Sequence, residues 1–140
     1  MATLHGTQMG KLRVAPQAVP DPGFVDGTLR VFCEEIALSG QPTADTVAVA
    51  RLPKGAVPLF GVLLTDTPLG TATIALGVAG DGGRYRAAAP LTVTDTPELF
   101  GTVAATGAAL GAEETVLLSI GTAALPRSGT LRVMFVYSFD

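Results

Sequence analysis

The 140-residue chain has no tryptophan, one cysteine and one histidine, and only 15% of its residues are charged. Ordinary soluble domains have roughly 25% charged residues. One cysteine excludes an intramolecular disulfide, and one histidine leaves little from which to build a zinc site. The low net charge of -3 and the isoelectric point near 5.0 disfavour nucleic acid as a partner. Hydrophobic residues make up 48% of the chain, which excludes intrinsic disorder as its main state.

Long apolar segments are also missing. The longest candidate, residues 55–65, is interrupted by Pro58 and is far shorter than the ~20 residues of a membrane-spanning helix. Residues 1–6 lack the basic start and apolar core of a signal peptide. We therefore expect no membrane partner and one hydrophobic core, since two cores would leave too few residues for each.

The first 26 residues differ from the rest of the chain. They hold three prolines and three glycines, and they show no sustained hydrophobic periodicity. This composition predicts an extended N-terminal arm over residues 1–26, followed by a single β-sandwich domain over residues 27–140. Four apolar residues of the arm are candidate interface residues: Leu4, Met9, Leu12 and Val14. A frayed terminus is the alternative interpretation.

From residue 28 on, period-2 alternation and turn residues dominate. With 17 glycines and 10 prolines, the segments between turns are short. The pattern predicts about eight strands, at residues 28–38, 46–52, 56–65, 71–79, 84–86, 91–93, 113–120 and 130–139, with strand and loop over 100–110. The fold class is therefore all-β: an antiparallel β-sandwich or a jelly-roll-like barrel.

Three local features refine this prediction. The apolar phase switches at Glu34-Glu35, which predicts a β-bulge there. Cys33 lies on an apolar phase of its strand and is expected to be a small, buried core residue. Residues 56–65 are apolar on both faces, as in a central strand covered on both sides, while Pro58 indicates an edge or a bulge near its start.

A four-residue motif occurs twice. Thr65-Asp66-Thr67-Pro68 recurs 29 residues later as Thr94-Asp95-Thr96-Pro97, each time after an apolar segment. Two copies are too few for a repeat protein. We expect two equivalent loops at the same end of the sandwich, in which Asp and Thr side chains bond turn amides.

The sequence offers no catalytic constellation. His5 lies in the arm, and Ser119 lacks the first glycine of a nucleophile elbow. The pairs Glu34-Glu35 and Glu113-Glu114 place adjacent carboxylates on opposite faces of a strand, as expected of solvated residues or a subunit contact. The glycine-rich loop at 80–83 lacks the residues of a phosphate or calcium site and is expected to be a hairpin turn. We therefore predict no catalytic, cofactor-binding or metal-binding residue.

Arg84-Tyr85-Arg86 is the one basic and aromatic cluster. Two arginines in an acidic chain are weak support for nucleic-acid stacking. Arginine and tyrosine are favoured as anchors of protein interfaces, so Arg84, Tyr85 and Arg86 are candidate interface residues.

Several stretches resemble small structural proteins of tailed-bacteriophage virions. They begin with Ala50-Arg51-Leu52-Pro53-Lys54-Gly55-Ala56-Val57, and continue through residues 69–80 and 84–89 to Ala124-Leu125-Pro126-Arg127-Ser128-Gly129-Thr130-Leu131. The resemblance spans residues 46–136. It implies a non-enzymatic β protein of the particle, a capsid decoration (cement) protein that binds the outside of the phage head and stabilises it.

The resemblance also implies partners and a location. The partners would be the major capsid protein and further copies of this chain, most simply as a trimer at a three-fold position. The chain would assemble in the host cytoplasm and reside on the capsid surface of the virion. The alternatives are a neck, tail or fibre component, or a small carbohydrate-binding β-sandwich, although the latter usually offers aromatic platforms.

Overall fold

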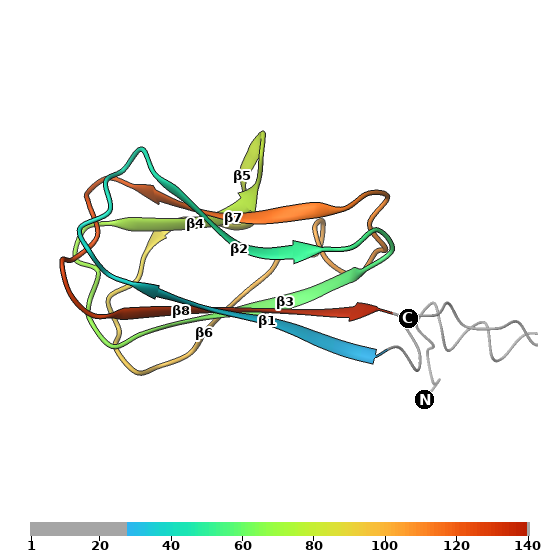
Figure 1. Ribbon diagram of the computed structural model, residues 1–140, viewed down its shortest axis with the longest axis horizontal. Coiled ribbons are helices and arrows are strands. Elements are labelled where there is room, and N and C mark those ends of the chain that lie inside the picture. Colours follow the sequence, from blue (N-terminus) through green and yellow to red (C-terminus); the bar gives the residue numbers. More distant parts are fainter. Residues whose placement is uncertain (1–27, 140) are drawn as a thin grey trace, which may run out of the picture.

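A computed structural model of the chain describes residues 28–139. It contains eight strands in two antiparallel four-stranded sheets stacked as a sandwich (Figure 1). The strands are β1 (Thr28–Ala37), β2 (Thr46–Leu52), β3 (Val57–Thr65), β4 (Thr73–Val78), β5 (Asp81–Pro90), β6 (Glu98–Phe100), β7 (Glu114–Gly121) and β8 (Thr130–Phe139). The predicted all-β sandwich of about eight strands is confirmed. No helix in residues 28–139 is long and apolar enough to cross a membrane.

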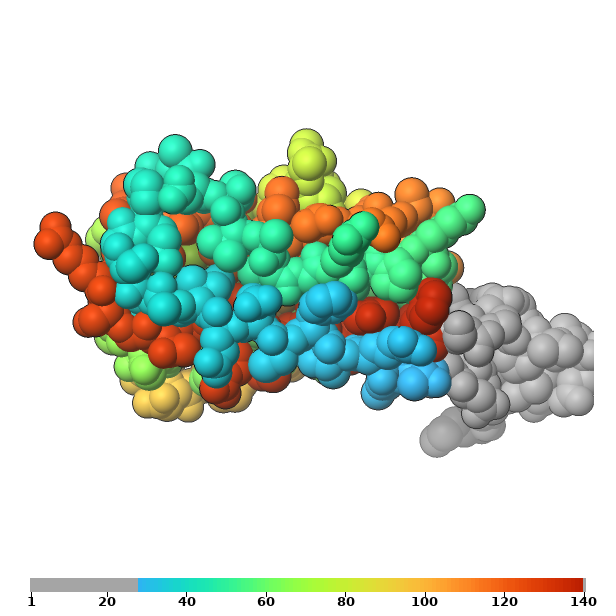
Figure 2. All heavy atoms as spheres, viewed as in Figure 1, coloured from blue at the N-terminus to red at the C-terminus, as the bar shows by residue number. Residues whose placement is uncertain are grey.

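The strand order is that of a jelly roll. Strand β1 pairs with β8, β2 with β7, β3 with β6 and β4 with β5, so the chain forms one long hairpin whose halves pair in reverse order. Rolling this hairpin gives one sheet of order β1-β8-β3-β6 and another of order β2-β7-β4-β5. Both β1 and β2 are therefore edge strands, and they lie on the same side of the sandwich (Figures 1 and 2).

The core lies between the sheets and is built from alternate residues of the strands. An aromatic cluster sits at its centre, where Tyr85 meets Phe135 edge-on with ring centroids 4.9 Å apart and Phe100 lies 6.1 Å from Phe135. Branched aliphatic residues fill the space around it: Leu52, Leu63, Ile74, Leu76, Val116, Leu118, Leu131 and Val133. Each such side chain contributes about 1.5–3 kcal/mol when removed from water.

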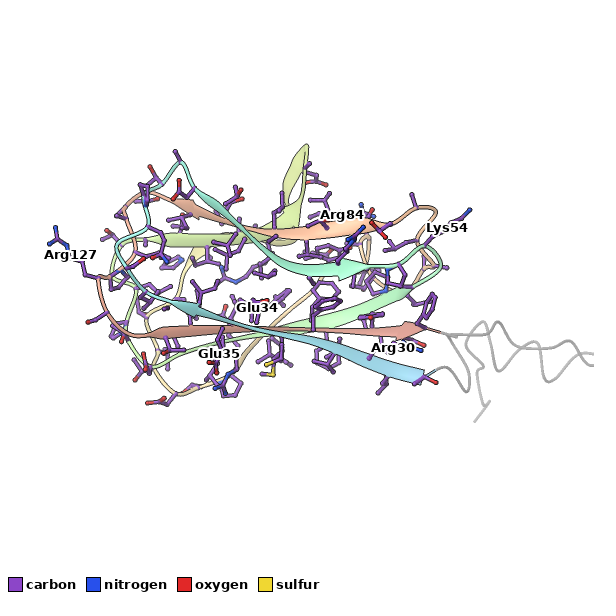
Figure 3. All side chains as sticks on the ribbon, in the orientation of Figure 1. Arg30, Glu34, Glu35, Lys54, Arg84 and Arg127 are labelled. Atoms are coloured by element: carbon purple, nitrogen blue, oxygen red, sulfur yellow. The ribbon has the colours of Figure 1, made fainter. Side chains whose placement is uncertain are left out.

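Strand β1 corrects two predictions. Its register with β8 runs without interruption from Thr28 to Ala37, so the β-bulge expected at Glu34-Glu35 is absent. Figure 3 shows Glu34 on the side of the other sheet and Glu35 on the opposite side, as in an unbroken strand. Cys33 is exposed and is not a core residue, because its phase of β1 points away from the second sheet. The core phase of β1 carries Phe32 and Ile36 instead.

Two predictions for β3 are confirmed, and two others in this region are wrong. Strand β3 is central, between β8 and β6, and its register with β8 is irregular between Pro58 and Phe60, as the proline predicted. Its outer side is not covered within residues 28–139, contrary to expectation, since Phe60 is exposed there. No strand occurs at residues 91–93; the side chain of Leu91 is buried there, and its main-chain carbonyl accepts a hydrogen bond from Leu69 N–H.

Candidate interaction surface

The side of the β1-β8-β3-β6 sheet that faces away from the core is apolar. We call it the outer face. The register places its side chains in rows across the strands: Val31, Val136 and Phe60 form one row, and Cys33, Met134, Val62 and Leu99 form the next. Leu29 and Leu64 lie on the same face toward its two ends.

These side chains are unusually accessible for apolar residues in a sheet. Leu29 is 64% exposed, Val31 56%, Phe60 41% and Leu99 69%, while Met134, Val136 and Val62 are half-buried by their neighbours. Single exposed apolar residues are common, but contiguous apolar patches larger than a few hundred Å² mark interaction sites. The outer face is such a patch, and it spans all four strands of the sheet.

A hollow borders the outer face where β3 meets β6. It has a volume of about 320 Å³ and is lined by Leu59, Phe60, Leu99, Phe100, Gly101, Thr102, Val103 and Thr106. Val103 stands at its rim and is almost fully exposed. An apolar side chain of a partner would find carbon-rich walls here, as in the pockets that hold interface anchors.

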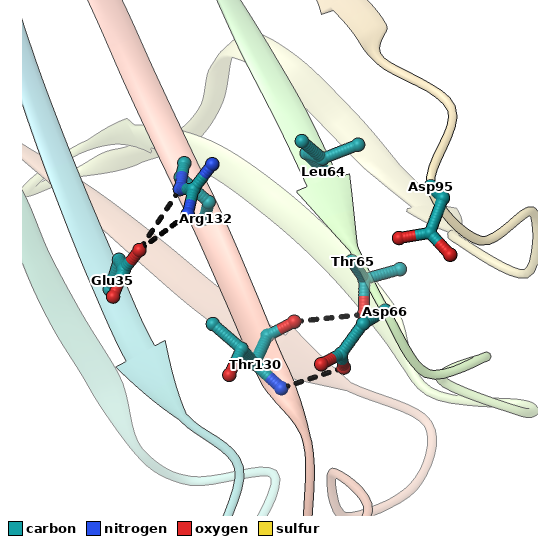
Figure 4. A pocket seen from close by; sticks show the side chains of 7 residues that line it. All are labelled: Glu35, Leu64, Thr65, Asp66, Asp95, Thr130 and Arg132. Atoms are coloured by element: carbon teal, nitrogen blue, oxygen red, sulfur yellow. Dashed lines mark hydrogen bonds and ion pairs between the residues drawn. The ribbon is translucent and has the colours of Figure 1, made fainter.

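The opposite end of the outer face is polar (Figure 4). Glu35 Oε1 accepts bonds from Arg132 Nη2 at 2.6 Å and Nε at 3.1 Å, so both charges are already paired. They line a cavity of about 250 Å³ together with Asp66 and Asp95. The outer face is therefore uncharged over its middle and ends at an internal ion pair.

This cavity confirms the shared location predicted for the repeated motif, but the two loops are not equivalent: Thr65 Oγ1 accepts the Thr67 N–H, whereas Thr96 Oγ1 donates to the Thr94 carbonyl. Asp66 and Asp95 lie at the same end of the sandwich, and Asp95 N–H donates to Thr65 O at 2.8 Å. Asp66 Oδ1 accepts the Thr130 N–H at 2.8 Å, and this bond lowers the pKa of the Asp66 carboxyl. The Asp66 side chain thus holds its loop against Thr130, whereas Asp95 is held through its main chain. No group of three metal-ligating side chains occurs among residues 28–139.

Arg84, Tyr85 and Arg86 lie on β5 and are not equally accessible. Tyr85 is 1% exposed and packs in the core, while its hydroxyl donates to Glu114 Oε2 at 3.2 Å. Arg84 bonds the other oxygen of Glu114 at 2.9 Å and remains half-buried at the surface. Burial and the Glu114 charge raise the pKa of Tyr85 to about 12.

Arg86 is a buried arginine with partners on both terminal nitrogens of its guanidinium. It forms an ion pair with Glu98 at 3.0 Å and donates to the carbonyls of Ile74 and Ala89. Tyr85 and Arg86 therefore hold β5 within the chain, and an interface role for the cluster stays a prediction. The other predicted interface residues, Leu4, Met9, Leu12 and Val14, lie outside the described residues.

Sequence reasoning did not identify the outer face as a site. The signal was present in residues 56–65, whose two apolar faces were expected to be covered on both sides. One of these faces packs in the core, and the other is Phe60, Val62 and Leu64 of the outer face. A strand that is apolar on both sides needs a second cover, which residues 28–139 do not supply.

Comparison with known proteins finds similar chains among solved structures of phage capsids, in line with the resemblance seen in the sequence. No protein-family model and no curated protein matches the chain. Among solved structures, it is similar to a chain of the "Cyanophage Pam1 capsid asymmetric unit", with 25% identity and a TM-score of 0.69 over 91% of this chain and 96% of that chain.

Two further phage structures share the fold. A chain of the "Capsid of Ralstonia phage GP4" has 20% identity and a TM-score of 0.62, covering 87% of this chain and 89% of that chain. A chain of the acid-stable capsid structure of Helicobacter pylori bacteriophage KHP30 has 11% identity and a TM-score of 0.62, covering 82% and 90%. The predicted resemblance to phage virion structural proteins is confirmed, and the likeness to the Pam1 capsid chain supports a structural role in a phage virion.

Proposed function

We propose that this chain is a capsid decoration (cement) protein that binds the outside of a phage head and stabilises contacts between capsid subunits. The observation that supports this most directly is the outer face, a contact surface without catalytic chemistry on a fold found in phage capsid structures. A protein that binds only the assembled shell stabilises that shell by mass action. A stable sandwich with few charges and a broad apolar surface suits such a role.

The proposed partners are the major capsid protein and further copies of this chain. The trimer that the resemblance implies is one arrangement of those copies, and residues 1–26 offer a second means of contact. An extended segment can add a strand to an exposed sheet edge, and β1 and β2 each have a free edge within the described part of the chain. On this proposal the protein resides on the capsid surface and joins the particle in the host cytoplasm.

The proposal is tested by adding the purified chain to particles that lack it. We expect saturable binding at many sites and a higher temperature of shell opening, which light scattering or release of a DNA-binding dye reports. A chain of residues 27–140, checked for its β-sheet circular dichroism, should bind more weakly because it lacks the arm. Undiminished binding would remove the arm from the mechanism. Binding of only a few copies would favour the neck, tail or fibres instead.

A further inference from the structure

We propose that the outer face is the contact between two copies of this chain, packed sheet against sheet about a two-fold axis. This inference goes beyond the proposed function, because it concerns the free protein and does not depend on where the chain sits in a particle. It puts a pair in the place of the trimer that the resemblance implied, and it assigns the outer face to the contact between copies rather than to the contact with the capsid protein.

The chemistry of the outer face suits an identical partner. Its central rows are Val, Met, Phe, Leu and Cys, and the nearest charges, Glu35 and Arg132, are bonded to each other. Two such faces therefore meet without bringing like charges together. The inner face of the same sheet has a similar composition and packs on the second sheet of the sandwich, so this kind of surface already forms a sheet-to-sheet contact within the molecule.

The size of the outer face also fits a pair. Strands lie about 4.8 Å apart and rise about 3.3 Å per residue, so two strands of 10 residues, one of 9 and a fourth of 3 give a plane of about 500 Å². Two copies would bury on the order of 1,000 Å² or more once side-chain relief is counted, which reaches the lower limit of specific interfaces. The hollow beside Phe60 and Leu99 would seat an apolar side chain of the partner.

The arm of the same chain is a poorer candidate for this cover. Residues 1–26 contain one short stretch with strand character, residues 11–14, among prolines and glycines. One extended segment covers about one strand width, whereas the outer face spans four. A second copy covers all four strands at once, and each copy covers the other to the same extent.

The test measures the mass of the full chain by analytical ultracentrifugation over a series of concentrations. We expect a monomer-to-dimer equilibrium. Val31→Asp should weaken pairing by at least about a hundredfold, because a carboxylate enters the contact once from each copy. Val93→Asp is the matched control: Val93 is 60% exposed, similar to Val31, but lies in a loop outside the four strands. It should pair like the original chain.

Cys33 provides a second readout, because it is the only cysteine and lies on the outer face. Its alkylation by a maleimide should slow as the concentration rises through the dimer range, and should stay fast in Val31→Asp. Equal pairing of Val31→Asp and Val93→Asp, or a trimer, would overturn the proposal. A monomer at all concentrations would overturn it as well. Slow alkylation of Cys33 in that monomer would mean that residues 1–27 cover the outer face, and fast alkylation would mean that the outer face awaits another protein.

Discussion

At the scale of single residues, the sequence reveals which residues are apolar but not which way they point. Leu29, Val31 and Cys33 alternate as a core phase should, yet they form the outer face, while Phe32 and Ile36 point inward. Because β1 is apolar on both sides, period 2 cannot choose between its faces. The change of phase at Glu34 therefore resembled a bulge. Only the second sheet, which is distant in sequence, decides which side is core.

The burial of Arg86 was not predicted from the sequence, for a related reason. A buried arginine is rare unless it is paired, and the partners of Arg86 are the Glu98 carboxylate twelve residues away, the Ile74 carbonyl of β4 and the Ala89 carbonyl of its own strand. Nothing in the local sequence announces these partners. An Arg-Tyr-Arg cluster with two of its three members inside the chain therefore had the appearance of a surface motif.

Tyr85 gives a prediction about pH. Its pKa is raised to about 12 in the folded chain, against 10.0 for an ordinary tyrosine, so the folded state resists losing this proton. The resulting stability is fully present below pH 10 and is lost as the pH rises from 10 to about 12. Tyr85→Phe removes the ionisable group and should flatten this part of the stability curve, measured by urea unfolding at a series of pH values.

The same variant should lose about 1 kcal/mol at pH 7, because the hydroxyl bond to Glu114 disappears. Comparing the two proteins at each pH separates Tyr85 from the other groups that titrate in alkali. If stability falls in parallel for both proteins between pH 10 and 12, the burial of an un-ionised Tyr85 is not the cause.

At the scale of elements, the sequence predicts strands well where turns separate clear alternation. Strands β2, β7 and β8 lie within a residue of their expected positions. The β4–β5 hairpin predicted at residues 80–83 is present, but its turn is Ala79-Gly80, and residues 81–83 already belong to β5. The strand predicted at residues 91–93 is absent, because Leu91 packs in the core from a loop and Val93 is exposed. A loop that supplies a core side chain has the same local signature as a short strand.

Strand β3 contains a glycine that the packing requires. A Cβ on Gly61 would lie 1.9 Å from Cζ of Phe100, whose ring is buried and packs against Phe135. Gly61→Ala must displace this ring and should cost about 1–3 kcal/mol of unfolding free energy. Gly111→Ala is the control, since nothing lies within 4 Å of its Cβ position, and its effect should be small.

A second variant identifies the cause of the Gly61 effect. In a chain that already carries Phe100→Leu, Gly61→Ala should cost less unfolding free energy than it does in the original chain, because the smaller side chain leaves space for the methyl group. Thermal or urea unfolding of the four proteins gives the coupling. Additive effects would mean that the ring does not set the requirement for glycine.

At the scale of the whole molecule, two facts meet in one account. The pairing of strands in reverse order makes a jelly roll of two sheets, with no helix and no group of three metal-ligating side chains in residues 28–139. That scaffold leaves one sheet apolar on the side away from its core. In a monomer this face is exposed to water within the described residues. Assembly with a second copy or on a shell would cover it.

The proposed role in the particle rests on resemblance, because the chemistry of the residues alone does not indicate it. The low charge argued against nucleic-acid binding and the lack of a catalytic constellation argued against an enzyme, but neither observation favoured one structural role over another. The outer face supplies the physical reason for assembly, but a face identifies its partner only through size and charge. The number of copies in the particle is the quantity that separates a decoration protein from a neck, tail or fibre component.

The most direct test is therefore quantitative peptide mass spectrometry on gradient-purified particles, giving the copy number of this chain relative to the major capsid protein. A decoration protein predicts a ratio within a small factor of one, or of one-third. A few to a few tens of copies per particle would contradict decoration of the head, and absence from the particle would contradict a virion role altogether.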